Sequence, residues 1–240
     1  MAKQVTLSDT LKFPTQTLAE KHFRQILYAY TPGERVSERE HEEHLRLLIE
    51  NHPEVVQKVG AGIDYFFVNN AKASTRCFYL SRIDGSTTDF SFLTAIKGQK
   101  PPLLSQFKEA CREAVQPHLL EAKDNYFKEN QNARGEVERE VTRQLITKDD
   151  AQVDHNGVSF NVMVLAWIEA NELEITDDLL TPSMDNQFVS RFANEKLEEQ
   201  WVKYHNNFCK KHKTLRVIQK KANLSLSSRS KIVPSKKPLM

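Results

Sequence analysis

The residues of this sequence whose types could do chemistry are an acidic residue and the histidine that follows it, Asp154 and His155. They end a short run with strand character, and apolar, helix-like sequence begins at Val158. A carboxylate is a hard oxygen ligand for a divalent cation, and an imidazole can take a proton from water near neutral pH. The pair could therefore bind a metal and activate water, although a lone Asp-His pair is more often structural than catalytic.

Composition limits the class of protein. The 240 residues are 39% hydrophobic and 28% charged, which is typical of a soluble globular protein with one large or two small domains. The three cysteines are far apart, which favours a reducing compartment over a disulfide framework or a paired-cysteine zinc site. We see neither a secretory signal nor an apolar run of about 18 residues, so we expect a cytoplasmic protein that makes no membrane contact.

Charge is unevenly distributed along the chain. Residues 201–240 hold eleven Lys/Arg and no Asp/Glu, so the first 200 residues carry 23 basic and 32 acidic residues, a net of −9. A basic end on an acidic body suggests contact with a polyanion, and a solvated tail is the alternative. The Ser-, Lys- and Pro-rich residues 225–240 are predicted to be disordered.

Hydrophobic periodicity predicts an α+β protein in two parts. In residues 17–98, two helices cover an antiparallel meander of strands at 62–69, 75–82 and 87–96. Residues 103–224 form a mostly helical domain with a β-hairpin that turns at Lys148–Asp150 and carries the Asp-His pair. Its predicted helices cover 105–131, 158–170 and 186–211, and a short strand covers 215–218.

The first part resembles a known family. The stretches HPEVVQKVGAGIDYFFV and RCFYLSRIDGSTTDFSF, within residues 20–98, are similar to the DCL domain, named for a plant factor whose loss gives defective chloroplasts and leaves. That resemblance implies a link to nucleic acid without known catalysis, because the plant family is implicated in chloroplast ribosomal RNA maturation. The same domain also occurs in the tail of plant-specific RNA polymerase subunits.

The predicted sheet could itself contact nucleic acid. Arg76 and Arg82 lie six residues apart on one face of a strand, with aromatic residues interleaved. Such a face could stack bases and hold phosphates. The alternative is that the aromatic residues are core and the arginines pair with Asp84 and Asp89, because a three-stranded sheet must bury one face.

The second part resembles the HNH, or ββα-metal, nucleases. The resemblance implies that His155 is the general base and that Asp154 is a ligand of Mg²⁺ or Mn²⁺. The closing segment LRVIQKKANLS would supply Asn223 as the second ligand, and His205 or Asn206 would orient the base. One metal with few protein ligands leaves positions open for phosphate and water.

The closing segment departs from the family pattern. Gln219 and Ala222 stand where cysteines of a structural zinc site would lie, so no structural zinc is expected. The basic residues of this region are predicted to contact nucleic acid: Lys213, Arg216, Lys220 and Lys221.

Three functions follow from these features. The leading hypothesis is a metal-dependent endonuclease that hydrolyses phosphodiester bonds in DNA or RNA. The alternative is a non-catalytic RNA- or ribonucleoprotein-binding factor that uses the DCL-like module. In the third, the acidic N-terminal body binds a protein partner.

Overall fold

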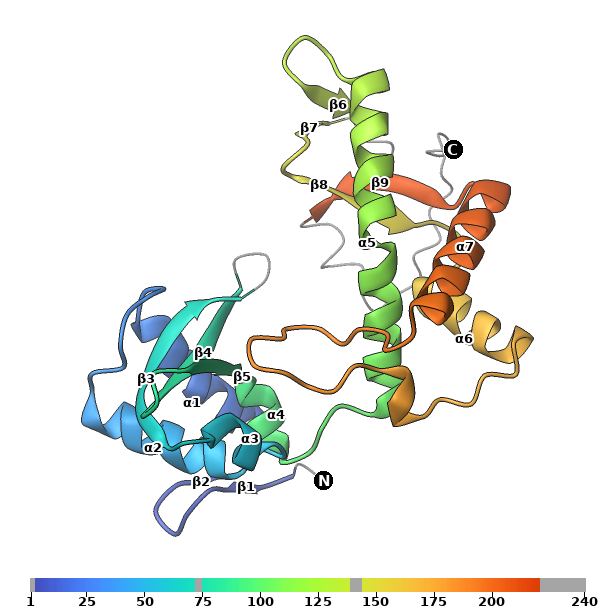
Figure 1. The fold of residues 1–240 in the computed structure, drawn as a ribbon. Helices are drawn as coiled ribbons and strands as arrows, with labels where there is room; N and C mark the ends of the chain where they lie inside the picture. Colours follow the sequence, from blue (N-terminus) through green and yellow to red (C-terminus); the bar gives the residue numbers. More distant parts are fainter. Residues whose placement is uncertain (1–2, 72–74, 139–143, 221–240) are drawn as a thin grey trace. The chain divides into compact units, whose positions relative to one another are not determined.

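The computed structural model describes residues 3–71, 75–138 and 144–220 of the chain (Figure 1). The chain divides into two compact units. The first unit comprises residues 1–102 together with 182–188, and the second comprises residues 103–181 and 189–240. Helices and antiparallel sheets occur in both units, which confirms the predicted α+β class. Among the described residues, no helix is both long enough and apolar enough to cross a membrane.

The first unit contains the predicted antiparallel meander. The strands β3, β4 and β5 lie side by side in sequence order, with β4 in the centre. Gly33 to Val36 run beside β3, with the Val36 N–H donating to the Phe66 carbonyl at 2.9 Å. The elements are β1 Val5–Thr6, β2 Lys12–Phe13, α1 Gln16–Ala29, α2 Arg39–Glu50, α3 Val55–Val59, β3 Ile63–Asn70, β4 Arg76–Arg82, β5 Thr87–Phe90 and α4 Phe92–Lys97.

One face of this sheet is buried beneath helices. Alternate strand residues point to opposite faces, and those on the covered face pack with apolar residues of α1, α2 and α4. The core-facing residues of the three strands are Phe66, Val68, Phe78, Leu80 and Phe90. Phe66, Phe78 and Phe90 therefore stabilise the fold, as the alternative interpretation of the sequence stated. The ion pairs differ from that interpretation, because Arg82 pairs with Asp185 and Asp89 lies beside Lys58.

The third predicted strand is wrong in its second half. β5 ends at Phe90, and α4 follows instead of the expected strand residues up to 96. The Ser91 hydroxyl caps α4 by accepting the Thr94 N–H at 3.3 Å, and Gly98 ends the helix at φ 63°. These two caps outweigh the strand propensity of the residues between them.

The second unit is arranged around one long helix, α5. The helices α6 and α7 and the strands β6 and β8 all pack against α5. Aromatic side chains fill the interior, and the Trp201 indole donates to the Cys111 carbonyl at 2.7 Å. The elements are α5 Leu103–Asn130, β6 Glu136–Glu138, β7 Leu145–Thr147, β8 Ala151–His155, α6 Phe160–Ala170, a 3-10 turn at Asp177–Leu179, α7 Glu195–His212 and β9 Leu215–Gln219.

The prediction of a hairpin turning at Lys148–Asp150 is wrong, because the strands on either side of this turn, β7 and β8, pair with other strands. β7 pairs with β6, and β8 pairs antiparallel with β9 (Figure 1). In this register Asp154 lies opposite Arg216 and His155 opposite Leu215. The turn residues at 148–150 indicate only a local reversal, and they cannot reveal that the strand after them pairs with a partner some 60 residues further along.

The last helix begins later than predicted. α7 starts at Glu195, where the Asn194 side chain accepts the Leu197 N–H at 3.1 Å. The expected start, Asn186, instead has φ 58° and belongs to a non-helical segment, residues 182–188, that packs in the first unit. This segment is held there by side-chain contacts that no local pattern in the sequence encodes.

Candidate functional sites

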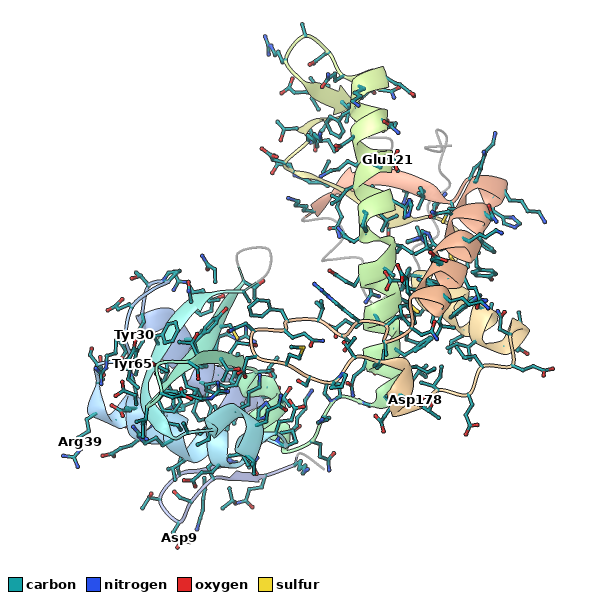
Figure 2. The ribbon with its side chains drawn as sticks, in the orientation of Figure 1. Asp9, Tyr30, Arg39, Tyr65, Glu121 and Asp178 are labelled. Atoms are coloured by element: carbon teal, nitrogen blue, oxygen red, sulfur yellow. The ribbon has the colours of Figure 1, made fainter. Side chains whose placement is uncertain are left out.

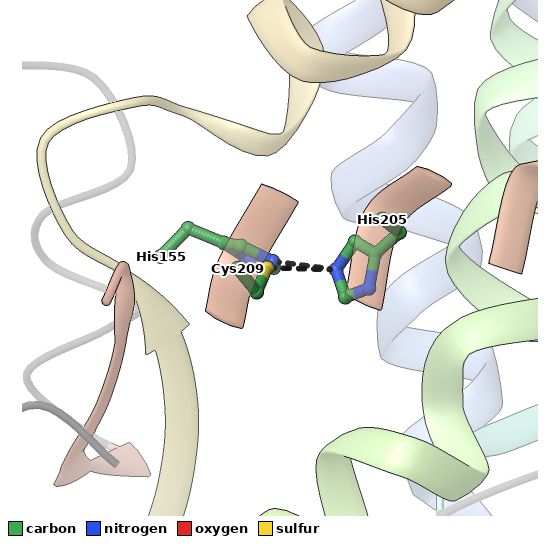
Figure 3. A group of neighbouring side chains, drawn as sticks. All are labelled: His155, His205 and Cys209. Carbon is green, nitrogen blue, oxygen red and sulfur yellow. Dashed lines mark hydrogen bonds between the residues drawn. The ribbon is translucent and has the colours of Figure 1, made fainter. Parts of the chain in front are cut away.

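The two histidines assigned to the nuclease-like site lie together in the second unit. His155 ends β8 and His205 lies in the middle of α7, and their Nε2 atoms are 2.9 Å apart (Figure 3). Both side chains are buried. From the sequence, His205 or Asn206 was expected to orient His155; in the structure His205 contacts His155, and Asn206 contacts His205. Asn223, the predicted second metal ligand, lies outside the described residues, and so does Lys221, a predicted nucleic-acid contact.

The predicted metal ligand Asp154 is held by an arginine. One carboxylate oxygen accepts from Arg216 Nη2 at 2.9 Å and from Arg216 Nε at 3.3 Å. The two side chains are 6% and 3% exposed, so the ion pair is shielded from water. Asp154 therefore balances a buried cation here, and Arg216, which was predicted to contact nucleic acid, faces a carboxylate of its own chain.

Cys209 is a third member of the cluster, which the sequence analysis missed. Its Sγ lies 3.6 Å from His205 Nε2, and the ligand atoms of His155, His205 and Cys209 all lie within 4.8 Å of one another. A sequence signal was present, because His205 and Cys209 are four residues apart and such residues share one face of a helix. The partner on β8 could be found only from the tertiary structure.

Local geometry keeps these three side chains in place. Lys213 ends α7 in the left-handed conformation at φ 49°, so that the chain reverses directly into β9. The Thr214 N–H donates to the Cys209 carbonyl at 3.2 Å, and the Asn156 N–H donates to the Thr214 carbonyl at 2.6 Å. The end of α7 and the end of β8 are therefore connected through Thr214.

The surroundings of the cluster are apolar. Burial is the main cause that lowers the pKa of His205, with a smaller effect of His118, and the hydrogen bond to Asn206 opposes it. Burial also raises the pKa of the Cys209 thiol. The set offers two imidazole nitrogens and a sulfur, which are ligands for zinc and similar metals, whereas Mg²⁺ prefers oxygen. The described residues at this site do not fit Mg²⁺.

In the first unit, Arg82 is buried in a network of its own. Its guanidinium donates twice to the Asp185 carboxylate at 2.8 Å, and it also donates to the backbone carbonyls of Gln57 and Lys58. The Arg82 side chain is 6% exposed. Arg82 therefore fastens segment 182–188 and α3 to the sheet, and contact with phosphate would require this network to open.

Arg76 lies at the other end of β4. It donates to the Tyr30 carbonyl at 3.1 Å, and its guanidinium carbon lies 5.1 Å from the centre of the exposed Tyr28 ring. Arg76 and Arg82 share one face of β4, as the sequence analysis stated, but this is the face that the helices cover. Of the basic residues predicted in the closing segment, Lys213 and Lys220 are exposed.

The opposite face of the sheet carries a row of aromatic rings. The Phe67 ring stacks on the Tyr79 ring with 5.1 Å between the ring centroids, and its centroid lies 5.9 Å from that of Tyr65, which is labelled in Figure 2. The guanidinium carbon of the exposed Arg35 lies 4.5 Å from the centre of the Tyr65 ring. Phe188 of segment 182–188 covers the Tyr79 end, so Tyr79 is buried whereas Tyr65 and Phe67 are partly exposed.

Comparison with known proteins finds similarity in the first unit. Residues 24–96 match the family described as "Protein of unknown function (DUF3223)". "Protein DCL homolog, chloroplastic" of Arabidopsis thaliana is 37% identical over 79 residues, which are 31% of this chain and 36% of that protein. "DNA-directed RNA polymerase IV subunit 1" of Arabidopsis thaliana is 32% identical over 82 residues, which are 34% of this chain and 6% of that protein.

A solved structure also matches part of the chain. It is the solution NMR structure of an uncharacterized protein from Rhodospirillum rubrum, with 29% identity and a TM-score of 0.36, covering 40% of this chain and 92% of that one. The chain spans little more than a third of the length of the DCL homolog. Together the sequence matches support a DCL-like domain in the first unit. The family match ends at residue 96, before the pair Asp154-His155.

Proposed function

We propose that this protein binds single-stranded nucleic acid through the open face of the sheet in its DCL-like domain. The observation that carries the proposal is the ring row on that face: Tyr65 and Phe67 remain partly exposed, and Arg35 lies over Tyr65. Unpaired bases stack on aromatic side chains, and an arginine guanidinium can stack and attract phosphate at the same place.

Two further features support this choice. The partly exposed rings lie on adjacent outward positions of one strand, a spacing that presents both rings to the same ligand. In addition, a protein that carries a similar stretch is by name a subunit of a DNA-directed RNA polymerase. The net positive charge of residues 201–240 would add a sequence-independent attraction to any nucleic acid.

Fluorescence anisotropy with labelled single-stranded RNA, single-stranded DNA and duplex DNA tests the proposal. We expect the wild type to bind the single strands more tightly than the duplex. Tyr65→Ala and Arg35→Ala should each weaken single-strand binding, and loss of a stacking ring costs about 1–3 kcal/mol, or roughly 5- to 150-fold in Kd.

Arg39→Ala is the matched control for Arg35→Ala. Arg39 is an exposed arginine of the same unit, labelled in Figure 2, that pairs with Glu43 on α2. Its loss removes the same charge and keeps the Arg35 guanidinium over Tyr65. If Arg35→Ala and Arg39→Ala weaken binding equally, only net charge matters and the ring row is not the binding surface. If the wild type binds no nucleic acid at all, the proposal is wrong.

A second candidate function is metal-dependent cleavage of the bound strand. The contact between His155 and His205, with an acidic residue beside His155 and a helix after it, favours this candidate. It takes second place because the histidines are buried and Asp154 is held by Arg216. Incubation of the same nucleic acids with Mg²⁺, Mn²⁺ or EDTA tests it: cleavage that needs the metal and disappears in His155→Gln would establish the nuclease.

A further inference from the structure

We infer that His155, His205 and Cys209 form a binding site for a transition-metal ion of the Zn²⁺ class, which fastens β8 to α7. This site differs from the predicted nuclease site, in which Asp154 and Asn223 bind the metal. It contains no carboxylate, and it uses a cysteine outside any paired-cysteine motif. It also revises the expectation that the chain holds no structural zinc. The inference is independent of the nucleic-acid proposal, which rests on the first unit.

The distances suit a tetrahedral ion. Zinc lies about 2.0–2.1 Å from histidine nitrogen and about 2.3 Å from cysteine sulfur, so tetrahedral geometry separates two nitrogens by about 3.3 Å and a nitrogen from a sulfur by about 3.6 Å. The structure has 2.9 Å between the two Nε2 atoms and 3.6 Å between His205 Nε2 and Cys209 Sγ. To hold the ion, the two imidazole nitrogens would have to separate by a few tenths of an ångström. The third pair of ligand atoms, those of His155 and Cys209, lies within 4.8 Å.

A neighbouring hydrogen bond sets the correct tautomer of His205. Its Nδ1 lies 3.0 Å from the Asn206 Oδ1, an acceptor, so Nδ1 carries the proton and Nε2 presents a lone pair. That lone pair points toward both His155 and Cys209. Metal-ligating histidines use the same arrangement, in which the second ring nitrogen donates to an oxygen and thereby fixes the ring.

The surroundings explain why an ion would be retained. The rings of Phe160 and Trp201 lie against His205, at centroid distances of 6.2 and 5.8 Å, and the three ligand residues are at most 8% exposed. Binding of the divalent ion would release the thiol proton of Cys209 and convert it to a thiolate. The ion would also keep a fourth position for water or another donor, because the group has three members among the described residues.

Metal content and cobalt absorption test the site directly on the full chain. After loading with Zn²⁺ and removal of free metal, mass spectrometry should find one ion per chain in the wild type. Co²⁺ in place of Zn²⁺ should give an intense sulfur-to-cobalt charge-transfer band. Cys209→Ser should lose that band and bind at least tenfold more weakly.

Cys111→Ser is the matched control, because Cys111 is another buried cysteine in the same core cluster. We expect this variant to keep both the ion and the band. Retention of the band in Cys209→Ser, or its loss in Cys111→Ser but not in Cys209→Ser, would overturn the assignment. A wild type that takes up no Zn²⁺ or Co²⁺ would show that the two histidines form only a hydrogen-bonded pair.

Two further measurements keep the test decisive if Cys209→Ser does not fold. Zn²⁺ should raise the thermal unfolding midpoint of the wild type relative to EDTA, and equal midpoints would contradict the site.

Asn206→Ala leaves all three ligands in place and removes only the acceptor for His205 Nδ1. It should weaken metal affinity by about 10- to 100-fold, as is typical when such a supporting group is lost. Unchanged affinity would show that Asn206 does not orient a ligand.

Discussion

At the scale of single residues, two arginines buried in the described part of the chain each pair with a carboxylate of the same chain. Arg216 meets Asp154 in the second unit, and Arg82 meets Asp185 in the first. The sequence predicts nucleic-acid contact for Arg82, because aromatic residues are interleaved along its strand, and for Arg216, because it lies in the basic closing segment. Sequence analysis could not anticipate their burial, since each carboxylate partner is more than 60 positions away.

Removal of one member of the Asp154–Arg216 pair should be costly. Arg216→Met leaves a buried carboxylate without its cation, and the expected loss of unfolding free energy is about 3–5 kcal/mol. The double variant Asp154→Asn/Arg216→Met should recover most of that loss. Urea unfolding followed by tryptophan fluorescence measures it, because both tryptophans, Trp167 and Trp201, lie in the second unit. Equal stability of wild type and Arg216→Met would contradict the pairing.

His52 should make the stability of the first unit sensitive to acid. It is 4% exposed, its Nδ1 accepts the Glu54 N–H at 3.1 Å, and burial lowers its pKa from 6.5 to about 4. Because the unfolded chain takes up the proton first, the stability present above pH 6.5 is lost as pH falls toward 4. The fall in pKa from 6.5 to about 4 corresponds to an expected loss of about 3 kcal/mol across this window.

His52→Asn tests this expectation by removing the titrating group. Urea midpoints measured by circular dichroism at pH 7 and pH 4.5 should differ less in this variant than in the wild type. Some slope will remain, because burial also lowers the pKa of His22 in the same unit. His118→Asn, at an exposed position of the second unit, serves as the control. An unchanged slope in His52→Asn would rule out a neutral buried His52.

At the scale of elements, segment 182–188 is far in sequence from the first unit but packs as part of it. Asp185 binds Arg82, the Ser183 carbonyl accepts from Gln57 at 2.6 Å, and Asn186 donates to the Thr87 carbonyl at 3.1 Å. The Arg82 guanidinium holds the pKa of the Asp185 carboxyl below its usual value. The segment is therefore fastened by side chains and not by a strand ladder.

Loss of the Asp185 carboxylate should release this segment. In Asp185→Ala we expect faster hydrogen–deuterium exchange over residues 182–188. The increase should be about fivefold if the ion pair with Arg82, in which the Asp185 side chain is 41% exposed, contributes roughly 1 kcal/mol. Asp178→Ala, in the 3-10 turn (Figure 2), removes an exposed aspartate outside the network and should leave the segment's exchange unchanged. Equal exchange in the wild type and Asp185→Ala would show that other contacts hold the segment.

At the scale of the whole molecule, the sequence predicted what depends on local periodicity. The α+β class, the three-strand order of β3, β4 and β5 and most helices follow from patterns within about 20 residues. The errors arose where capping or distant pairing decided the outcome, as in α4 and the β8–β9 pair. Within the cluster of His155, His205 and Cys209, the closeness of His205 and Cys209 follows from their helical spacing, which is local. The contact with His155 joins distant parts of the chain, so the sequence pattern does not reveal it.

The most direct test of the central claim is ultraviolet crosslinking of a single-stranded RNA to the purified wild-type chain, followed by mass spectrometric mapping of the adducts. If the open sheet face binds unpaired bases, crosslinked nucleotides should concentrate on the peptide that contains Tyr65 and Phe67, and Arg35→Ala should reduce their yield. Adducts found only on the second unit, or no adducts above those formed with an unrelated basic protein, would contradict the account.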